Sequence, residues 1–196
     1  AAIRAVAALE RDAVVRAAER LRAAGHPCPL VSVGSTPTAL FAEDLTGVTE
    51  MRPGVFFAMD LYQAGLGCCG LEDLAVSVVA SVIGRRPEGG RLLIDAGALA
   101  LSQDRSTGGQ PLDAGYGLAG PLDGPPWPDA RVVQVNQEHG FLKFADPARA
   151  AALPVGTRLR IWPNHACMTA AAYPAYAVTD GGDEVLGDWP RINHWR

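Results

Sequence analysis

Apolar residues recur every three or four positions through residues 1–24 and predict an amphipathic helix, with Arg and Glu between them. The apolar face of this helix comprises Ile3, Val6, Ala7, Leu9, Ala13, Val14, Ala17 and Leu21. Gly25 predicts the end of the helix, and Pro27 and Pro29 behind it support that end, because proline cannot continue a helix.

The following segment alternates between strand-like and helix-like patterns. Residues 29–33 are a short apolar run that stops at Gly34 and predicts a buried strand. A helix is expected to open at Thr36 as the N-cap, with Pro37 as the first helical residue. A second strand is predicted over residues 55–59. The order helix–strand–helix–strand is typical of a parallel α/β fold.

One or two such units cannot close a parallel sheet or cover both of its faces. We therefore expect residues 1–72 to be the C-terminal portion of an α/β (TIM-type) barrel that is incomplete in this sequence.

From residue 73 to residue 196 the pattern changes to short runs rich in Val, Leu and Ile. Strand-like runs cover residues 74–83, 92–97, 131–135, 141–144 and 157–162. The turn at residues 138–140 predicts a hairpin, and the Gly- and Pro-rich residues 106–128 predict a long loop. The fold class is therefore predicted as α+β: a barrel remnant followed by a mostly antiparallel β domain, barrel-like or sandwich-like.

Composition excludes several classes of protein. The chain has 196 residues, 48% of them hydrophobic, and a net charge of −4, which is typical of a globular protein. The sequence has no run of Lys or Arg, so we expect no nucleic-acid partner. It has no apolar run long enough for a membrane span. Four cysteines do not form a disulfide framework in a chain of this length, so we expect a reducing, cytoplasmic setting.

Two Gly-containing loops are candidate phosphate sites. Gly34, Ser35 and Thr36 lie between a predicted strand and a predicted helix, where free N–H groups and hydroxyls favour an anion. A capped turn explains the same residues equally well. The segment Arg52-Pro53-Gly54-Val55 precedes the predicted strand over 55–59, so its fit to a phosphate is weaker, and a turn with an exposed Arg remains the alternative.

Two histidine motifs could carry chemistry. His139 stands in the turn Glu138-His139-Gly140, where it could be a general acid/base or a ligand, although ordinary turn chemistry is the favoured interpretation of this motif alone. His165 and Cys167 would face the same side of an extended segment and could bind zinc. Two protein ligands are too few for a structural zinc site and would leave positions open, as in a catalytic site. From spacing alone, a buried cysteine beside a core histidine is the better interpretation.

Taken in order, these motifs resemble one family. The segments that carry the resemblance are Gly34–Thr38, Met51–Gly54 with Phe57, Asp60 and Gln63, Asp95–Gly97 with Ser102 and Asp104, Gln137–Gly140, Pro163–Cys167 with Thr169, and Asp188–Pro190. The set is similar to the C-terminal half of the D-serine dehydratase / D-threonine aldolase family, a group related to alanine racemase. The resemblance implies a fold-type III pyridoxal-phosphate enzyme, built from an α/β barrel and a β-rich domain.

The resemblance also implies roles for individual residues. Those that would bind the cofactor are Gly34, Ser35 and Thr36 for its phosphate, Gly54 and Val55 through their N–H groups, and Arg52 near its ring nitrogen. His165 and Cys167 match the family's metal pair. Cys167 stands where the aldolase branch typically has Asp, which favours zinc and the dehydratase branch.

By the same resemblance, the parent protein is a metal-dependent lyase acting on β-hydroxy D-amino acids, and is a homodimer. D-Threonine aldolase activity and a non-catalytic metal-binding or dimerisation module remain the alternatives. The family's Schiff-base lysine would lie upstream of this sequence, and Lys143, the single lysine here, does not match it. We therefore expect this chain to be a fragment that is inactive alone.

Overall fold

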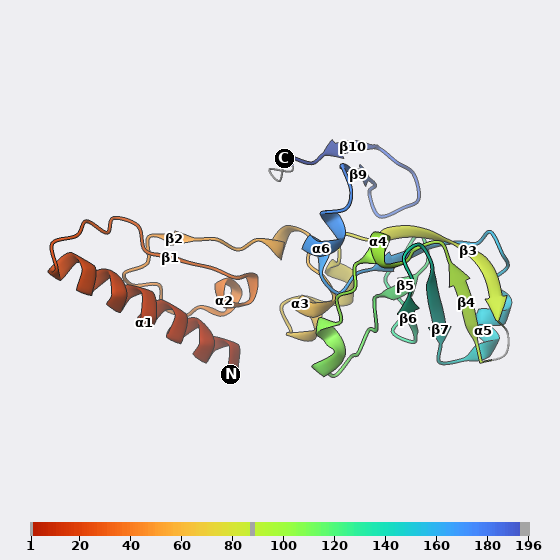
Figure 1. Cartoon of the computed structure of the whole chain (residues 1–196), viewed down its shortest axis with the longest axis horizontal. Helices are drawn as coiled ribbons and strands as arrows, with labels where there is room; N and C mark the ends of the chain where they lie inside the picture. The colour runs from red at the N-terminus through yellow and green to blue at the C-terminus, as the bar shows by residue number, and fades with distance from the viewer. Residues whose placement is uncertain (1, 87–88, 193–196) are drawn as a thin grey trace. The chain divides into compact units, whose positions relative to one another are not determined.

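The structure is a computed structural model that describes residues 2–86 and 89–192. The chain divides into two compact units, of which one ends at Phe57 and the other begins at Ala58. Figure 1 shows the elements of each unit. The predicted domain boundary at residue 72 stays a prediction about the domains of the parent protein.

The first unit begins with α1 (Ala2–Ala23), the predicted amphipathic helix. Its end is also as predicted, because Gly25 has φ +84° and the N–H of His26 bonds back to the carbonyl of Leu21 at 3.0 Å. On the inward side of α1, Ala7 and Ala18 are buried. The helix packs against α2 and β1 of the same unit (Figure 1).

Two short parallel strands follow, β1 (Ser32–Val33) and β2 (Glu50–Met51), with α2 (Thr36–Phe41) between them. Val33 pairs with Met51 in the parallel register. The helix α2 starts one residue earlier than predicted. Ser35, not Thr36, is the N-cap, because its hydroxyl accepts a bond from the N–H of Thr38 at 3.3 Å.

The strand predicted over residues 55–59 is wrong. The strand lies earlier, at β2, and η1 (Val55–Phe57) is a turn of 3-10 helix. Pro53 has no N–H to donate, and Met59 has φ +50°, so a ladder cannot continue through this segment. The apolar run that suggested a buried strand instead leaves Phe56 and Phe57 exposed.

The second unit is built on a closed antiparallel barrel, which confirms the predicted β-rich character of this part of the chain. Its strands are adjacent in the order β3, β4, β7, β6, β5, β8. Their bounds are β3 (Val78–Arg86), β4 (Arg91–Ile94), β5 (Leu118–Gly120), β6 (Ala130–Val135), β7 (Gly140–Phe144) and β8 (Arg158–Trp162). The predicted hairpin is the β6–β7 pair, in which Val135 faces Gly140.

Alternate residues of these strands point inward and form the core. Leu142 on β7 pairs with Leu92 on β4 and with Val132 on β6, and all three are buried. A period of two along each strand thus places one apolar layer inside the barrel. The other large side chains of this core are Val82, Ile94, Phe144, Leu159 and Ile161.

The predicted loop over residues 106–128 contains a strand that the sequence did not reveal. Strand β5 has three residues and joins β6 to β8, so it closes the barrel. Leu118 pairs with Trp162 on one side and with Arg131 on the other. A segment so short has no measurable alternation, and the surrounding Gly and Pro residues obscure it.

Short helices and one hairpin complete this unit. They are α3 (Leu61–Gly65), η2 (Leu71–Asp73), α4 (Ala98–Leu101), η3 (Ser106–Gly109), α5 (Pro147–Ala152), α6 (Ala166–Ala170), β9 (Ala175–Val178) and β10 (Gly187–Pro190). In Figure 1, α6 joins the barrel to the β9–β10 hairpin. Within the described ranges, no helix has both the length and the apolar character needed to cross a membrane.

The barrel core predicts a large effect for Leu142→Ala. We expect a loss of about 2–5 kcal/mol in the free energy of unfolding, because a fully buried side chain leaves a cavity. Urea denaturation followed by tryptophan fluorescence measures it, since Trp127 packs on Phe144 with ring centroids 5.9 Å apart. Leu99→Ala, at a position 59% exposed, should change stability by about 0.5 kcal/mol or less. Equal losses in the two variants would contradict the core assignment.

Candidate functional site

The two candidate phosphate loops meet at the ends of β1 and β2. A Cβ on Gly34 would lie 2.7 Å from the backbone N of Arg52, so only glycine allows this approach. The N–H of Arg52 bonds to the carbonyl of Val33 at 2.9 Å. Because β2 precedes Gly54, both loops follow the carboxyl ends of parallel strands. The corrected strand position therefore strengthens the candidate that was weaker in the sequence.

The polar groups of these loops differ in how far their hydrogen bonds are satisfied. The hydroxyl of Ser35 is engaged with Thr38, at 2.9 Å from its Oγ1. The hydroxyl of Thr36 is buried and has no hydrogen-bond partner among the described residues. Gly54 is exposed and has open space where a side chain would stand. An unpaired hydroxyl and an open backbone position are features that an anionic group could use.

Arg52 extends its exposed side chain from the end of β2. Its Nε donates to the hydroxyl of Ser32 at 2.6 Å and lies 3.3 Å from the carboxylate of Glu50. Val55, the last predicted cofactor residue, begins η1 and is half-buried. All six predicted cofactor residues thus belong to the first unit.

His165 and Cys167 lie in the second unit, where the chain leaves β8. Contrary to the prediction, the segment is not extended: His165 is the N-cap of α6 and Cys167 lies in the first helical turn. Cys167 is exposed, and the side chain of His165 is 43% exposed. Both therefore stand at the surface of the barrel domain, and the core histidine and buried cysteine favoured by spacing alone are not observed.

A carboxylate contacts the ring of His165. Oδ2 of Asp104 lies 3.6 Å from Nδ1 of His165, while Oδ1 accepts bonds from the N–H and hydroxyl of Ser106. Partial burial disfavours the ionised form of Asp104, but the bonds from Ser106 and the neighbouring His165 outweigh it and lower the pKa of this carboxyl. With Nδ1 facing Asp104, Nε2 is the nitrogen left for a metal.

Asn164 fixes the segment that carries both candidate ligands. Its side chain is buried and donates to the carbonyls of Asp104, at 2.8 Å, and Gly115, at 2.7 Å. Its Oδ1 accepts a bond from the hydroxyl of Thr107 at 3.1 Å. The loop over residues 104–115 is therefore tied, at three of its residues, to the residue that immediately precedes His165.

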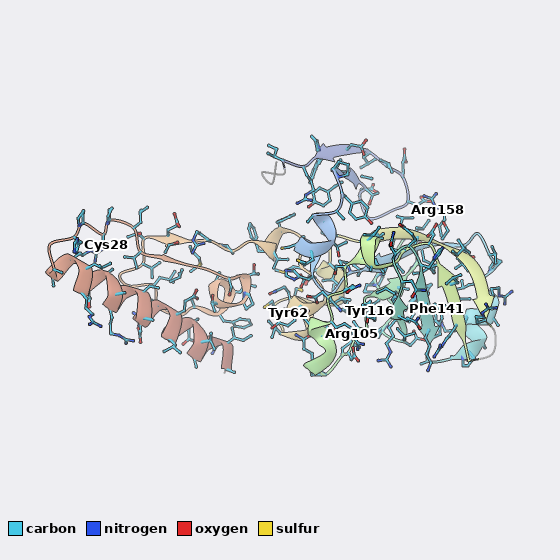
Figure 2. The ribbon with its side chains drawn as sticks, viewed as in Figure 1. Cys28, Tyr62, Arg105, Tyr116, Phe141 and Arg158 are labelled. Carbon is cyan, nitrogen blue, oxygen red and sulfur yellow. The ribbon has the colours of Figure 1, made fainter. Side chains whose placement is uncertain are left out.

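The loop of Asp104 has a second support. Figure 2 shows Arg105 beside Tyr116, with the guanidinium 5.1 Å from the ring centroid. Arg105 also pairs with Asp113 at 3.4 Å. These contacts stabilise the loop that carries Asp104 through a cation–π interaction and a partly exposed ion pair.

The electrostatics of Cys167 favour a neutral thiol until a cation binds. Partial burial, and after it the charge of Asp60, raise the pKa of Cys167. Binding of a metal would displace this proton, because the thiolate is the ligand. Within the described ranges, no group of three or more His, Cys, Asp and Glu residues is arranged to hold a metal. His165 and Cys167 suit a soft divalent ion whose remaining positions are open.

Two further residues of this unit were considered in the sequence, His139 and Lys143. His139 is exposed in the β6–β7 turn, whose backbone accepts bonds from the N–H groups of Ala98 and Leu99 at the start of α4. A catalytic role for His139 stays a prediction. Lys143 is exposed on β7 and faces Arg91 and Arg131 on the neighbouring strands.

Sequence reasoning assigned no role to three residues of this site, Asp60, Asp104 and Asn164. A signal existed for Asp60, because an Asp before an apolar residue is a typical N-cap. The contacts of Asp104 and Asn164 join residues far apart in the chain, and no local pattern reports them.

Comparison with known proteins shows the family of the chain. The chain belongs to the family described as "Putative serine dehydratase domain", which it matches over residues 75–179. The D-threo-3-hydroxyaspartate dehydratase of Delftia sp. is 49% identical over 99% of this chain and 52% of its own length. The D-serine dehydratase of Dictyostelium discoideum is 32% identical over 90% of this chain and 46% of its own length. The chain thus spans about half the length of these relatives.

Solved structures show the same similarity. The Delftia enzyme has a TM-score of 0.89 at 49% identity, covering 99% of this chain and 52% of that one. D-Threonine aldolase from Filomicrobium marinum is more distant, with a TM-score of 0.69 at 26% identity, covering 95% of this chain and 46% of that one. Two further structures are variants of D-threo-3-hydroxyaspartate dehydratase. One has alanine for a histidine, and the other, in the metal-free form, has alanine for the cysteine two positions later.

The contacts of Asn164 predict a marked effect for Asn164→Ala. The carbonyls of Asp104 and Gly115 would each lose a buried partner, at a cost of about 1–3 kcal/mol for each group left unsatisfied. Chemical denaturation measures this loss. Asn136→Ala, at an exposed position, is the matched control and should be close to neutral. If Asn164→Ala were as stable as this control, the hydrogen bonds of the Asn164 side chain would be absent in solution.

Proposed function

We propose that this chain is part of a pyridoxal-phosphate-dependent, metal-assisted dehydratase of β-hydroxy D-amino acids. One observation carries the proposal: His165 and Cys167 both lie at the surface where α6 begins, with Asp104 on the Nδ1 side of the histidine. The two residues are two positions apart, as are the histidine and the cysteine that are replaced in the two variants of D-threo-3-hydroxyaspartate dehydratase. We propose zinc as the metal, because a thiolate and an imidazole are both good ligands for it.

The phosphate of the cofactor would bind at the loops that follow β1 and β2. The close approach of Gly34 to Arg52 supports this, and so do the open backbone of Gly54 and the unpaired hydroxyl of Thr36. Ser35 and Val55 would add N–H donors, and Arg52 would approach the ring nitrogen. The parallel β1–α2–β2 arrangement supports the further proposal that residues 1–72 complete an α/β barrel in the parent protein.

The site residues of the second unit each have a separate role in this proposal. His165 and Cys167 would hold the metal, Asp104 would keep the histidine ring oriented, and Asn164 would fix the backbone that directly precedes His165. A bound zinc ion polarises a hydroxyl group and makes it a better leaving group. Pyridoxal phosphate, when bound, acts as an electron sink for a carbanion at Cα. We propose His139 as a candidate acid/base and the cytoplasm as the location.

Dehydration is better supported than the alternatives. The relatives with the highest identities reported above are dehydratases, whereas the aldolase is 26% identical. A non-catalytic module is less well supported, because an enzyme matches 99% of this chain. D-Serine and 3-hydroxyaspartate, named in those relatives, are the substrates to test first. A homodimer is part of the proposal, and exposed side chains such as Phe57 and Trp189 are compatible with it.

The metal role predicts the behaviour of His165→Ala and Cys167→Ala in the complete protein. Both should lower bound zinc and reduce kcat/KM for D-serine and D-threo-3-hydroxyaspartate by about 100-fold or more, because the leaving group loses its Lewis acid. Elemental analysis and steady-state kinetics measure the two effects. A chelator should have the same effect on the unmodified protein, and added zinc should reverse it.

The control for these variants is His26→Ala, because His26 is exposed in the first unit and has no proposed role. His139→Ala should lower turnover while bound zinc stays at the wild-type level. Full activity of His165→Ala without zinc would refute the metal role.

The phosphate role predicts a selective effect of Gly54→Ala. A methyl group is tolerated there by the fold, since no atom lies within 4 Å of it, but it would obstruct the backbone approach to a phosphate. We expect roughly 10-fold weaker binding of pyridoxal phosphate, which corresponds to about 1.4 kcal/mol. Fluorescence titration measures it. Gly187→Ala, at an equally open position in β10, should bind normally, and unchanged affinity in Gly54→Ala would reject this phosphate site.

A further inference from the structure

Asp60 occupies an unusual position for a carboxylate in the second unit. It is the N-cap of α3, yet it is only 2% exposed. Oδ1 accepts a bond from the N–H of Gln63 at 2.9 Å, and Oδ2 accepts one from the N–H of Ala166 at 3.0 Å. One side chain therefore caps the start of α3 and also holds the start of α6.

The second of these bonds falls within the candidate metal pair. Ala166 is the residue between His165 and Cys167, and it is the first residue of α6. The backbone of α3 contacts the preceding residues as well. The N–H of Leu61 bonds to the carbonyl of Pro163 at 3.3 Å, and that of Tyr62 bonds to the carbonyl of Asn164 at 3.2 Å. The segment from 163 to 166 is thus held along its length by the start of α3.

We propose that Asp60 is the positioning residue of the metal pair: its carboxylate holds the peptide between His165 and Cys167 so that both side chains reach one ion. This inference rests on the proposed metal role of His165 and Cys167. It assigns to Asp60 a task that capping of α3 alone does not require. Groups that orient metal ligands typically change metal affinity 10–100-fold when they are removed.

Comparison with Asp146 separates this task from ordinary capping. Asp146 is the N-cap of α5, and its Oδ1 accepts a bond from the N–H of Ala148 at 2.9 Å. Asp146 is exposed, as expected for a cap that needs only one oxygen. Burial of a carboxylate costs free energy unless both oxygens are hydrogen-bonded. Asp60 meets that condition only because α6 supplies the second donor.

The negative charge of Asp60 would also favour a metal ion at this pair. Burial raises the pKa of Asp60, while the bonds from the N–H groups of Gln63 and Ala166 and, after them, the neighbouring His165 act in the opposite direction. A divalent cation held by one thiolate keeps a net positive charge, and a nearby buried carboxylate offsets it. Two variants can separate this contribution from positioning, since one removes the charge and the other removes the hydrogen bond and leaves the charge.

The test uses Asp60→Asn and Ala166→Pro in the complete protein. Asp60→Asn keeps the shape but loses the charge and one of the two acceptor oxygens. Ala166→Pro keeps the charge and deletes the N–H that Oδ2 accepts, and its ring carbon takes the place of that hydrogen, so the carboxylate has to move away from this peptide. Proline suits the first position of a helix, and His165, with φ −134° and ψ 99°, has an extended backbone close to the one that a residue before proline adopts.

Zinc affinity, measured by competition with a chromophoric chelator, should fall roughly 10–100-fold in both variants. The absorption band between cobalt and thiolate in the cobalt-substituted protein should weaken in parallel. Asp146→Asn is the matched control: it should leave zinc affinity and the cobalt spectrum unchanged. Thermal unfolding without metal shows whether each variant is folded.

Three results would overturn the inference or its basis, and they are distinguishable. If the unmodified protein binds no zinc, the proposed metal role itself fails. If it binds zinc and Asp60→Asn, while folded, binds it equally well, Asp60 is only a helix cap. If Asp60→Asn weakens binding but folded Ala166→Pro does not, the effect is one of charge and positioning is rejected. Should Asp60→Asn not fold, Ala166→Pro alone decides, because it tests the same hydrogen bond from the other side.

Discussion

The hydrogen bonds of the buried Asn164 carboxamide are the interaction on which the candidate site of the barrel domain depends. It joins the end of β8 to the carbonyls of Asp104 and Gly115 and to the hydroxyl of Thr107. A buried amide must satisfy both its donor and its acceptor groups, so this network holds the loop over residues 104–115 against the end of β8. The surface position of His165 and Cys167 follows from that arrangement, since both come directly after Asn164.

The packing around this residue explains why short helices suffice. Helix α6 has five residues and would not be stable alone. Its Thr169 donates to the carbonyl of Leu101 in α4 at 3.0 Å, and Tyr173 just beyond it donates to the carbonyl of Ala100 at 3.1 Å. Helix α4 in turn contacts the β6–β7 turn through the N–H of Ala98. Tertiary hydrogen bonds thus replace the helical length that usually provides stability.

Sequence patterns predicted those helices and strands in which apolar residues recur at a regular spacing over several turns or residue pairs. The amphipathic α1 and the alternating β8 were located well, because each repeats its signal over enough residues. Strand β5 was missed for the opposite reason, and β2 was misplaced because the apolar residues after Pro53 gave a stronger signal than the two residues of the strand itself. The order of motifs suggested the candidate metal pair, whose role stays a prediction. The contacts around this pair were not predicted, because the carboxylates that contact His165 and Ala166 come from 61 and 106 residues earlier in the chain.

The barrel and the β1–β2 sheet differ in whether their strands have unpaired edges. Every strand of the barrel has two neighbours, so the barrel offers no unpaired backbone edge. In the first unit, β1 and β2 form a sheet of only two strands, each paired on one side within the described residues. Parallel pairs of this size are not stable without further strands or covering helices. The open edges of β1 and β2 are therefore templates for strand addition. Further strands of a larger sheet could pair there, and so could a second copy of the isolated polypeptide, which would lead to uncontrolled self-association.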